Sequence, residues 1–361
     1  MSVRKRTWKT RAGESKEAWI VDYAQDGERH IKTFARKKEA DAYAQQIGVD
    51  IRAGVHTPVS KSITVAQAAE DWIKSIALDG REASTLAQYR QHARHITDRI
   101  GSYKLAGLTT PRLNSFRDDL LTTMSRAMAR KVLGSLKSLL RDAQRRGNVA
   151  QNVALAVKKI DADKRGEGRL KVGVDIPTTD EIKAIIAAAG SWRPLLLTAI
   201  FTGLRASELR GLRWSDMDLK TGELHVQQRA DRYNVIGKPK SRAGQRIVPL
   251  GPMAVNTLRA WRLVGPSREL VFASRTGKIF DHASLLRRTL EPAQLKAGVV
   301  TPDGKPKYTM HALRHFYASW CINRRADGGL ELPAKVVQQR LEAQRATDRR
   351  QHGLFGLFRK K

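Results

Sequence analysis

A histidine and an arginine lie three positions apart in the segment YTMHALRHFYASW, which runs from Tyr308 to Trp320. On a helix, His311 and Arg314 would share one face, so both polar ends could reach the same point. Both side chains donate hydrogen bonds to anionic oxygens, and together they suit a phosphate group. The pattern also fits a half-buried helix without chemistry, because short motifs often arise by chance.

Two other segments contain polar residues that could join such a site. The run PLLLTAIFTGLRASELRGLRWSDMDL predicts an apolar helix that ends at Gly203, followed by Arg205 and a second helix with Glu208. Glu208 lies three residues after Arg205, so it could hold the guanidinium in place. Lys240 lies in the turn-rich GKPKSRAG, where a lysine could give a proton to a leaving oxygen. Taken singly, Arg205 is also explained as a surface charge, and Lys240 is better explained as a solvated lysine of a turn.

The composition of the chain points to a polyanionic partner. The 361 residues include 67 Lys plus Arg against 35 Asp plus Glu, a net charge of +32 that is spread along the sequence. Such a charge favours nucleic acid or an acidic membrane surface, and nucleic acid is the leading interpretation. No apolar run approaches the roughly 20 residues of a membrane span, and MSVRKRTWKTR lacks the apolar region of a signal peptide.

Cysteine usage restricts the chemistry further. Cys321 is the only cysteine, which excludes an intramolecular disulfide and any cysteine-based zinc site. Its neighbours Trp320 and Ile322 predict a buried structural thiol. We expect a cytoplasmic, nucleoid-associated protein of bacterial or phage origin, with no metal and no cofactor.

The first part of the chain, residues 1–58, predicts a small module of strands and one helix. EAWIVDYA alternates Trp19, Val21 and Tyr23 on one face, and Asp26-Gly27 predicts a hairpin before RHIKTF. A helix follows from about residue 37, with apolar residues at helical spacing. The many basic residues near the start favour a minor DNA-contacting module about as much as a solvated surface.

A second unit, residues 62–157, predicts four short helices with basic outer faces. Thr64 is expected to cap the first helix, Thr110-Pro111 the third and Ser125 the fourth, which Gly147 ends. A run of charge is usually only a solvated face, yet the number of exposed cations here favours a DNA clamp. The expected DNA contacts are Arg90, Arg94, Arg130, Lys131, Lys137, Arg141 and Arg145.

The remainder divides into a linker, a third domain and a tail. KKIDADKRGEGRLK, residues 158–171, loses apolar periodicity and gains charge and glycine, as linkers do. Residues 172–341 contain the candidate chemistry and begin with Thr178 and Glu181 in a capping-box pattern. Two strand-like runs, residues 223–228 and 246–250, flank the Lys240 turn. Residues 342–361 form an atypical tail.

The order of the motifs resembles that of one protein family. TGLRASELRGLRWSDMD, then KPKSRAGQRIVPL, then MHALRHFYASW, all after a basic helical bundle, are similar to tyrosine recombinases, and most to phage-type integrases. The likeness covers nearly the whole chain. It implies a mainly α fold with small β elements: an arm-type N-terminal sheet and helix, a helical core-binding domain and a mixed α/β catalytic domain.

The resemblance also implies roles for individual residues. Arg205 matches the first catalytic arginine, Lys240 the hairpin lysine, His311 the histidine and Arg314 the second arginine. The implied reaction exchanges DNA strands at attachment sites through a 3′-phosphotyrosyl link, without metal or ATP, in a tetramer on double-stranded DNA. The arginines would neutralise the phosphate in the transition state, while His311 and Lys240 would move protons.

The nucleophile that the family requires is missing from its expected place. After the His-Arg helix the family has a segment LGH and then the nucleophilic tyrosine, whereas here Leu341 is followed by Glu342 and Ala343. No tyrosine follows Tyr317, which lies on the same predicted helix as Arg314 and is expected to point into packing. The tail resembles a frameshifted or recombined end.

Three functions remain open on the sequence. The first is a site-specific recombinase of a phage or mobile element, impaired in this chain by the missing tyrosine. The second is a non-catalytic DNA-binding protein derived from an integrase, and a covalent protein–DNA adduct would separate the two. The third, a basic RNA- or ribosome-associated protein, does not predict the ordered set of Arg, Lys, His and Arg.

Overall fold

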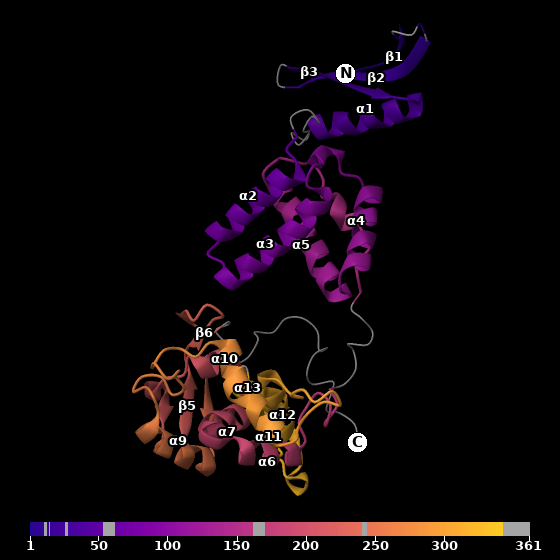
Figure 1. Ribbon diagram of the computed structural model, residues 1–361. Helices are drawn as coiled ribbons and strands as arrows, with labels where there is room; N and C mark the ends of the chain where they lie inside the picture. Colours follow the sequence, from indigo (N-terminus) through magenta and orange to yellow (C-terminus); the bar gives the residue numbers. More distant parts are fainter. Residues whose placement is uncertain are drawn as a thin grey trace. The chain divides into compact units, whose positions relative to one another are not determined.

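The chain folds into two compact units, residues 1–167 and 168–361, which are drawn in Figure 1. The computed structural model describes residues 1–10, 13, 15–25, 28–52, 62–161, 170–239 and 244–341. Helices dominate both units and the sheets are small, so the expected mainly α fold with small β elements is confirmed.

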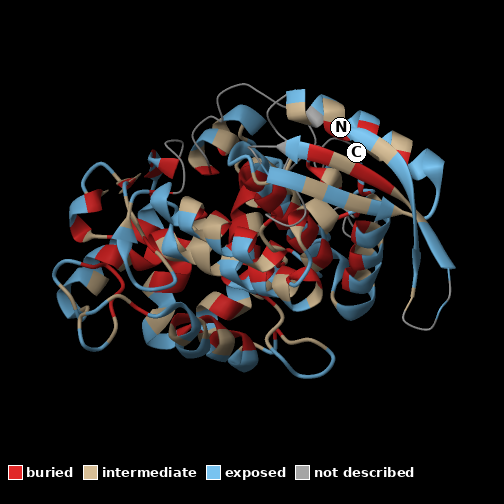
Figure 2. Cartoon of the chain, turned by 90° about the horizontal axis from the view of Figure 1, so that it is seen from above, coloured by how far each residue is buried: buried red, intermediate tan, exposed pale blue. Residues whose placement is uncertain are grey.

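The N-terminal sheet has three antiparallel strands in the order β1-β2-β3, formed by Ser2–Lys9, Ser15–Gln25 and Glu28–Phe34. Helix α1, Lys37–Arg52, packs on one face, where Val21 and Tyr23 are buried against Ala40 and Ile47. The alternation in β2 predicted this face. Strand β1 was not predicted because it is exposed along nearly all its length and shows no apolar alternation (Figure 2). The Asp26-Gly27 turn lies outside the described residues.

Four helices form the bundle of the first unit. They are α2 Val65–Leu78, α3 Ala83–Ile100, α4 Thr110–Thr123 and α5 Arg126–Arg145, with 3-10 turns η1 Leu105–Gly107 and η2 Val153–Ala156. Thr64 caps α2 and Ser125 caps α5, as predicted, because each side-chain oxygen accepts a backbone N–H of the first turn. The cap of α4 is Thr109, one residue before the expected position.

The second unit contains the remaining helices and strands. The helices are α6 Thr179–Ala188, η4 Gly190–Trp192, α7 Arg193–Thr202, α8 Ala206–Arg210, η5 Trp214–Asp216, α9 Pro252–Val264, α10 His282–Arg288, α11 Leu290–Lys296, α12 Met310–Ile322, η7 Arg325–Asp327 and α13 Ala334–Leu341. Strands β4 Met217–Asp218, β5 Glu223–Val226 and β8 Arg246–Pro249 form one antiparallel sheet. Strands β6 Arg229–Ala230 and β7 Ile236–Gly237 form a separate hairpin, which was not predicted.

Helix α7 occupies the core of this unit. Seven of its ten residues are buried, which explains why its sequence is apolar on every side instead of amphipathic. Helix α12 packs against α7, and a smaller cluster around Tyr317, Cys321 and Leu341 fixes α13 on α12. The thiol of Cys321 is buried, as the sequence indicated.

No single helix among the described residues is long and apolar enough to cross a membrane. Helices α6 and α7 meet that criterion only as a pair, which is bent by 117°.

Candidate active site

The end of helix α7 brings Arg205 to the site. Gly203 ends the helix in the left-handed conformation, with φ of 59°, and Arg205 follows as the N-cap residue of α8. A Cβ atom at this glycine would overlap with the ring of Tyr317 and press on the side chain of Leu341. Only glycine therefore satisfies both the backbone angle and the packing at this turn.

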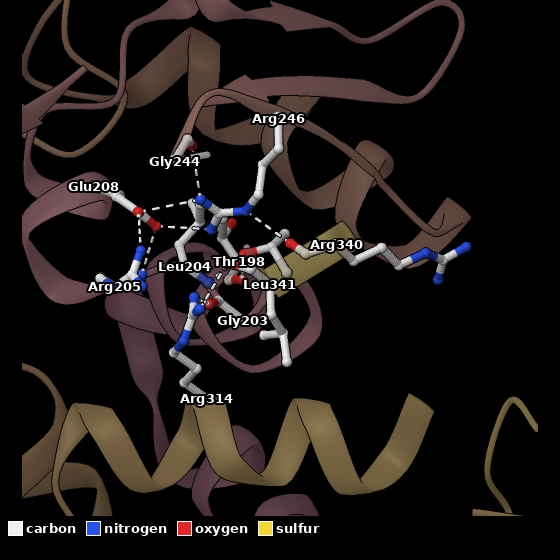
Figure 3. Close-up of polar contacts among 11 residues, drawn as sticks. Thr198, Gly203, Leu204, Arg205, Glu208, Gly244, Arg246, Arg314, Arg340 and Leu341 are labelled. Carbon is white, nitrogen blue, oxygen red and sulfur yellow. Dashed lines mark hydrogen bonds and ion pairs between the residues drawn. The ribbon is translucent and has the colours of Figure 1, made fainter. Parts of the chain in front are cut away.

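Glu208 connects two arginines from distant segments (Figure 3). Its Oε1 accepts from Nη1 of Arg205 at 2.9 Å, and its Oε2 accepts from the backbone N–H of the same residue at 2.9 Å. Nη1 and Nη2 of Arg246 donate to the two carboxylate oxygens at 3.1 and 2.8 Å. The side chains of Glu208 and Arg246 are each 2% exposed, whereas that of Arg205 is 35% exposed.

This arrangement gives the cluster a net positive charge. Burial alone would raise the pKa of Glu208, but the hydrogen bonds and charge of Arg246, with those of Arg205, lower it below the ordinary value. The carboxylate is therefore ionised, and one negative charge faces two guanidinium groups. The sequence predicted the pair of Arg205 and Glu208, but Arg246 was read only as the first residue of a strand.

Helix α12 places Arg314 beside the same turn. This side chain is 7% exposed; Nη1 donates to the carbonyl oxygen of Gly203 and Nη2 donates to that of Leu341 at 2.7 Å. Nε of Arg246 donates to the carbonyl oxygen of Arg340 at 2.7 Å. Two arginines therefore bind the last carbonyls of α13, which a helix leaves without intrahelical partners.

The bonds to carbonyls fix the guanidinium of Arg314 in place. Because Gly203 is only two residues before Arg205, the bond from Arg314 also fixes the two arginines relative to each other.

His311 lies one turn before Arg314 on α12 and is exposed to solvent. Burial on one side lowers the pKa of His311, and the positive charges of Arg314 and Arg205 lower it further. The ring is neutral at pH 7, where it can accept as well as donate a proton. The sequence did not identify His315, whose ring lies edge-on to that of His311 with centroids 4.5 Å apart.

Three of the four predicted site residues thus gather at one place. Arg205, His311 and Arg314 come from the α7–α8 turn and from α12, while Lys240 lies outside the described residues. Their catalytic roles stay predictions. Among the described residues, no group of three or more His, Cys, Asp or Glu is placed to bind a metal ion.

Tyr317 points into the interior, as predicted from its position on the helix. It is 1% exposed and contacts the cluster that holds α13 against α12. Burial and the neighbouring Cys321 raise the pKa of the Tyr317 phenol, so the hydroxyl stays protonated.

The predicted DNA-contacting cations of the bundle are mostly exposed. Arg90, Arg94, Arg130, Lys131, Arg141 and Arg145 reach solvent on α3 and α5. Lys137 departs from the expectation of full exposure, because it is partly buried and its Nζ donates to the carbonyl oxygen of Val157 at 3.2 Å. Burial and the charge of Lys159 lower the pKa of Lys137.

Comparisons with known proteins find relatives of this chain. Residues 177–342 match the model of the phage integrase family. A tyrosine recombinase XerC-like protein of Caldanaerobacter subterraneus subsp. tengcongensis is 25% identical over 336 residues, which are 84% of this chain and 82% of that protein. An integrase of Streptomyces ambofaciens is 24% identical over 86% of this chain and 84% of its own length.

The fold is similar to that of a solved integrase. The lambda integrase in a tetramer bound to a Holliday junction superposes with a TM-score of 0.61, at 19% identity, over 96% of this chain and 97% of that one. The chain is thus similar in sequence to the phage integrase family over residues 177–342, to a tyrosine recombinase over most of its length, and in fold to the lambda integrase.

Proposed function

We propose that this chain acts on double-stranded DNA as a site-specific integrase of a phage or mobile element, with a phosphodiester at the Arg205–Arg314 cluster. The observation that supports this most strongly is the convergence of two fixed arginines and a neutral histidine around the Gly203 turn. Fixed cations neutralise a phosphate without reorganising during the reaction.

Each residue then has a defined task. Arg205 and Arg314 bind the non-bridging oxygens, His311 moves a proton at the attacking or leaving oxygen, and Lys240 protonates the departing 5′-oxygen. Glu208 does not touch the phosphate but holds Arg205 and Arg246 in place. In such a reaction a tyrosine oxygen attacks phosphorus, and the bond from phosphorus to the 5′-oxygen breaks.

Each of the three proposed domains has its own role in binding DNA. In this proposal residues 1–58 form the arm-type module, 62–157 the core-binding domain with its cations on α3 and α5, and 172–341 the catalytic domain. The lambda integrase of similar fold is a tetramer on its DNA junction, and we propose a homo-oligomer of that kind here.

The chain by itself is proposed to bind DNA without cleaving it. No tyrosine follows Tyr317 in the sequence, and Tyr317 is buried with its phenol protonated. The same observation favours the second candidate function, a non-catalytic DNA-binding protein derived from an integrase. A neighbouring subunit that donates a tyrosine would restore cleavage in the first case.

Dimethyl phosphate, a small phosphodiester monoanion, tests the phosphate site directly. Titrated into the full chain and followed by NMR of the histidine rings, it is expected to shift the His311 signals and raise the pKa of that ring, because an anion stabilises the imidazolium. The ring of His225, on β5, is the internal control. Arg205→Gln should abolish the shift at His311, whereas equal shifts at both histidines in the unaltered chain would contradict the proposal.

A further inference from the structure

The turn between β6 and β7 presents an unusual set of side chains to solvent. Tyr233, Val235 and Ile236 are 48%, 61% and 41% exposed, and the guanidinium of Arg232 lies 5.3 Å from the centre of the Tyr233 ring. Within the described ranges, Arg232 forms no ion pair. The tip thus combines a cation, an aromatic ring and two β-branched apolar residues.

Hydrogen bonds within the turn fix its conformation. Oδ1 of Asp231 accepts the backbone N–H groups of Tyr233 at 2.8 Å and Val235 at 2.9 Å. The backbone N–H of Asp231 donates to the carbonyl oxygen of Val235 at 2.9 Å, and Asn234 takes a left-handed φ of 63°. The carboxylate of the turn is therefore directed at its own backbone and fixes the path of the turn.

A buried arginine locks the base of the turn. Arg210, at the end of α8, is 2% exposed; Nη1 donates to the carbonyl oxygen of Asp231 at 3.1 Å and Nη2 donates to Oδ1 of Asn234. Its Nε donates to the carbonyl oxygen of Phe280 at 2.5 Å. No described carboxylate forms an ion pair with Arg210, although the charges of Asp281 and Asp231 act on it, and its guanidinium donates to neutral oxygens of Asp231, Asn234 and Phe280. Because two of these oxygens belong to the turn, the hydrogen bonds hold the turn in one conformation.

A tip that is exposed, cationic and held in one conformation is suited to binding a partner. The conformational entropy lost on binding is smaller when the binding loop already has its bound conformation in the free protein. Four side chains cover too little area for a stable contact with a second copy, since specific protein interfaces bury on the order of 1,200 Å² or more. Arg232 and the nearby exposed Lys238 instead match a polyanion.

We propose that the β6–β7 turn is a preformed contact with duplex DNA, in which Arg232 binds a backbone phosphate while Tyr233, Val235 and Ile236 pack on the neighbouring deoxyriboses. This rests on the proposed function, because it takes DNA as the ligand of the chain. It adds a contact that neither the bundle nor the arginine cluster supplies.

The test compares two variants of the full chain on a fluorescein-labelled mixed-sequence duplex, with anisotropy measured across a salt series. The first variant, Arg232→Ala with Tyr233→Ala, removes the cation and the ring. The second, Arg275→Ala with Thr276→Ala, alters another exposed turn of the same unit, Ser274–Lys278, and removes the same charge.

We expect the first variant to lose affinity about tenfold and to lower the slope of log affinity against log salt by roughly 0.9, the value for one phosphate contact. The second variant should bind as the unaltered chain does. Equal affinities and slopes in all three proteins, equal losses in both variants, or a dimer that dissociates only in the first variant would overturn the inference. Salt-insensitive binding by the unaltered chain would instead overturn the proposed function.

Discussion

At the scale of single residues, Glu208 determines where two of the arginines lie. One buried carboxylate accepts hydrogen bonds from Arg205 and Arg246, so its removal leaves two cations without compensation. Neutralising one partner of a buried pair is far more costly than losing a surface ion pair.

Glu208→Gln is therefore expected to lower the free energy of unfolding by about 3 kcal/mol at pH 7. The lowered pKa of Glu208 sets the pH dependence: its stabilisation is present above the ordinary value of 4.5 and is lost as the pH falls through the folded-state pKa. The difference in stability between the two proteins should shrink below about pH 4.5. Urea unfolding at several pH values measures it, with the exposed Glu70→Gln as control. A difference that stays constant with pH would contradict the role given to the charge.

At the scale of elements, the short α7–α8 turn positions the site. Gly203 permits the left-handed end of α7, accepts a hydrogen bond from Arg314 and leaves room for Tyr317. Three separate requirements thus meet at one residue without a side chain.

Gly203→Ala should destabilise the protein by about 3 kcal/mol, the sum of backbone strain near 1 kcal/mol and steric overlap in the core. Gly298→Ala is the matched control, because Gly298 has a φ of 67° but open space around the added Cβ. Thermal unfolding should show a much smaller loss for the control, roughly 1 kcal/mol. Similar losses in the two variants would mean that overlap with Tyr317 contributes nothing.

Elements with local signals were predictable from the sequence, whereas those fixed by distant contacts were not. The caps at Thr64, Ser125 and Thr178 and the apolar stripes of the helices follow from residues a turn apart. Strand β1 and the β6–β7 hairpin depend on partners that their own sequences do not indicate. Arg246 was missed for the same reason, because its carboxylate partner is 38 positions away.

At the scale of the whole molecule, charge is the property that the sequence predicts most directly. The net charge of +32 follows from counting, and the exposed cations of α5 show where part of it lies. Which cations contact DNA depends on the complex and remains a prediction.

Arg141→Glu with Arg145→Glu should weaken binding to duplexes of every sequence and lower the salt slope by roughly 0.9 for each lost phosphate contact. The control, Lys74→Glu with Arg81→Glu, reverses two exposed cations elsewhere on the bundle; like the test pair, it breaks one ion pair at i,i+3. Anisotropy titrations at several salt concentrations compare them. Unchanged affinity and slope in the α5 variant would remove this helix from the DNA-binding surface.

The order of the three motifs was visible in the sequence, and the expected inward position of Tyr317 is confirmed by its burial, but its contacts needed the structure. The sequence places Tyr317 one turn after Arg314, and only the packing against Gly203 and α13 shows that its phenol is enclosed. The tail, residues 342–361, lies outside the described residues.

The most direct test of the account is the formation of a covalent complex on DNA. The full chain is incubated with a nicked suicide duplex that contains the attachment site of its own element, then denatured and separated by electrophoresis. In parallel, nuclease footprinting shows whether the site is bound, and the Streptomyces ambofaciens integrase on its own site verifies the assay. We expect a footprint without any denaturation-resistant complex, because Tyr317 is buried and no tyrosine follows it in the sequence. A covalent complex that forms with the unaltered chain would contradict the account, and its loss in Tyr317→Phe would identify Tyr317 as the nucleophile.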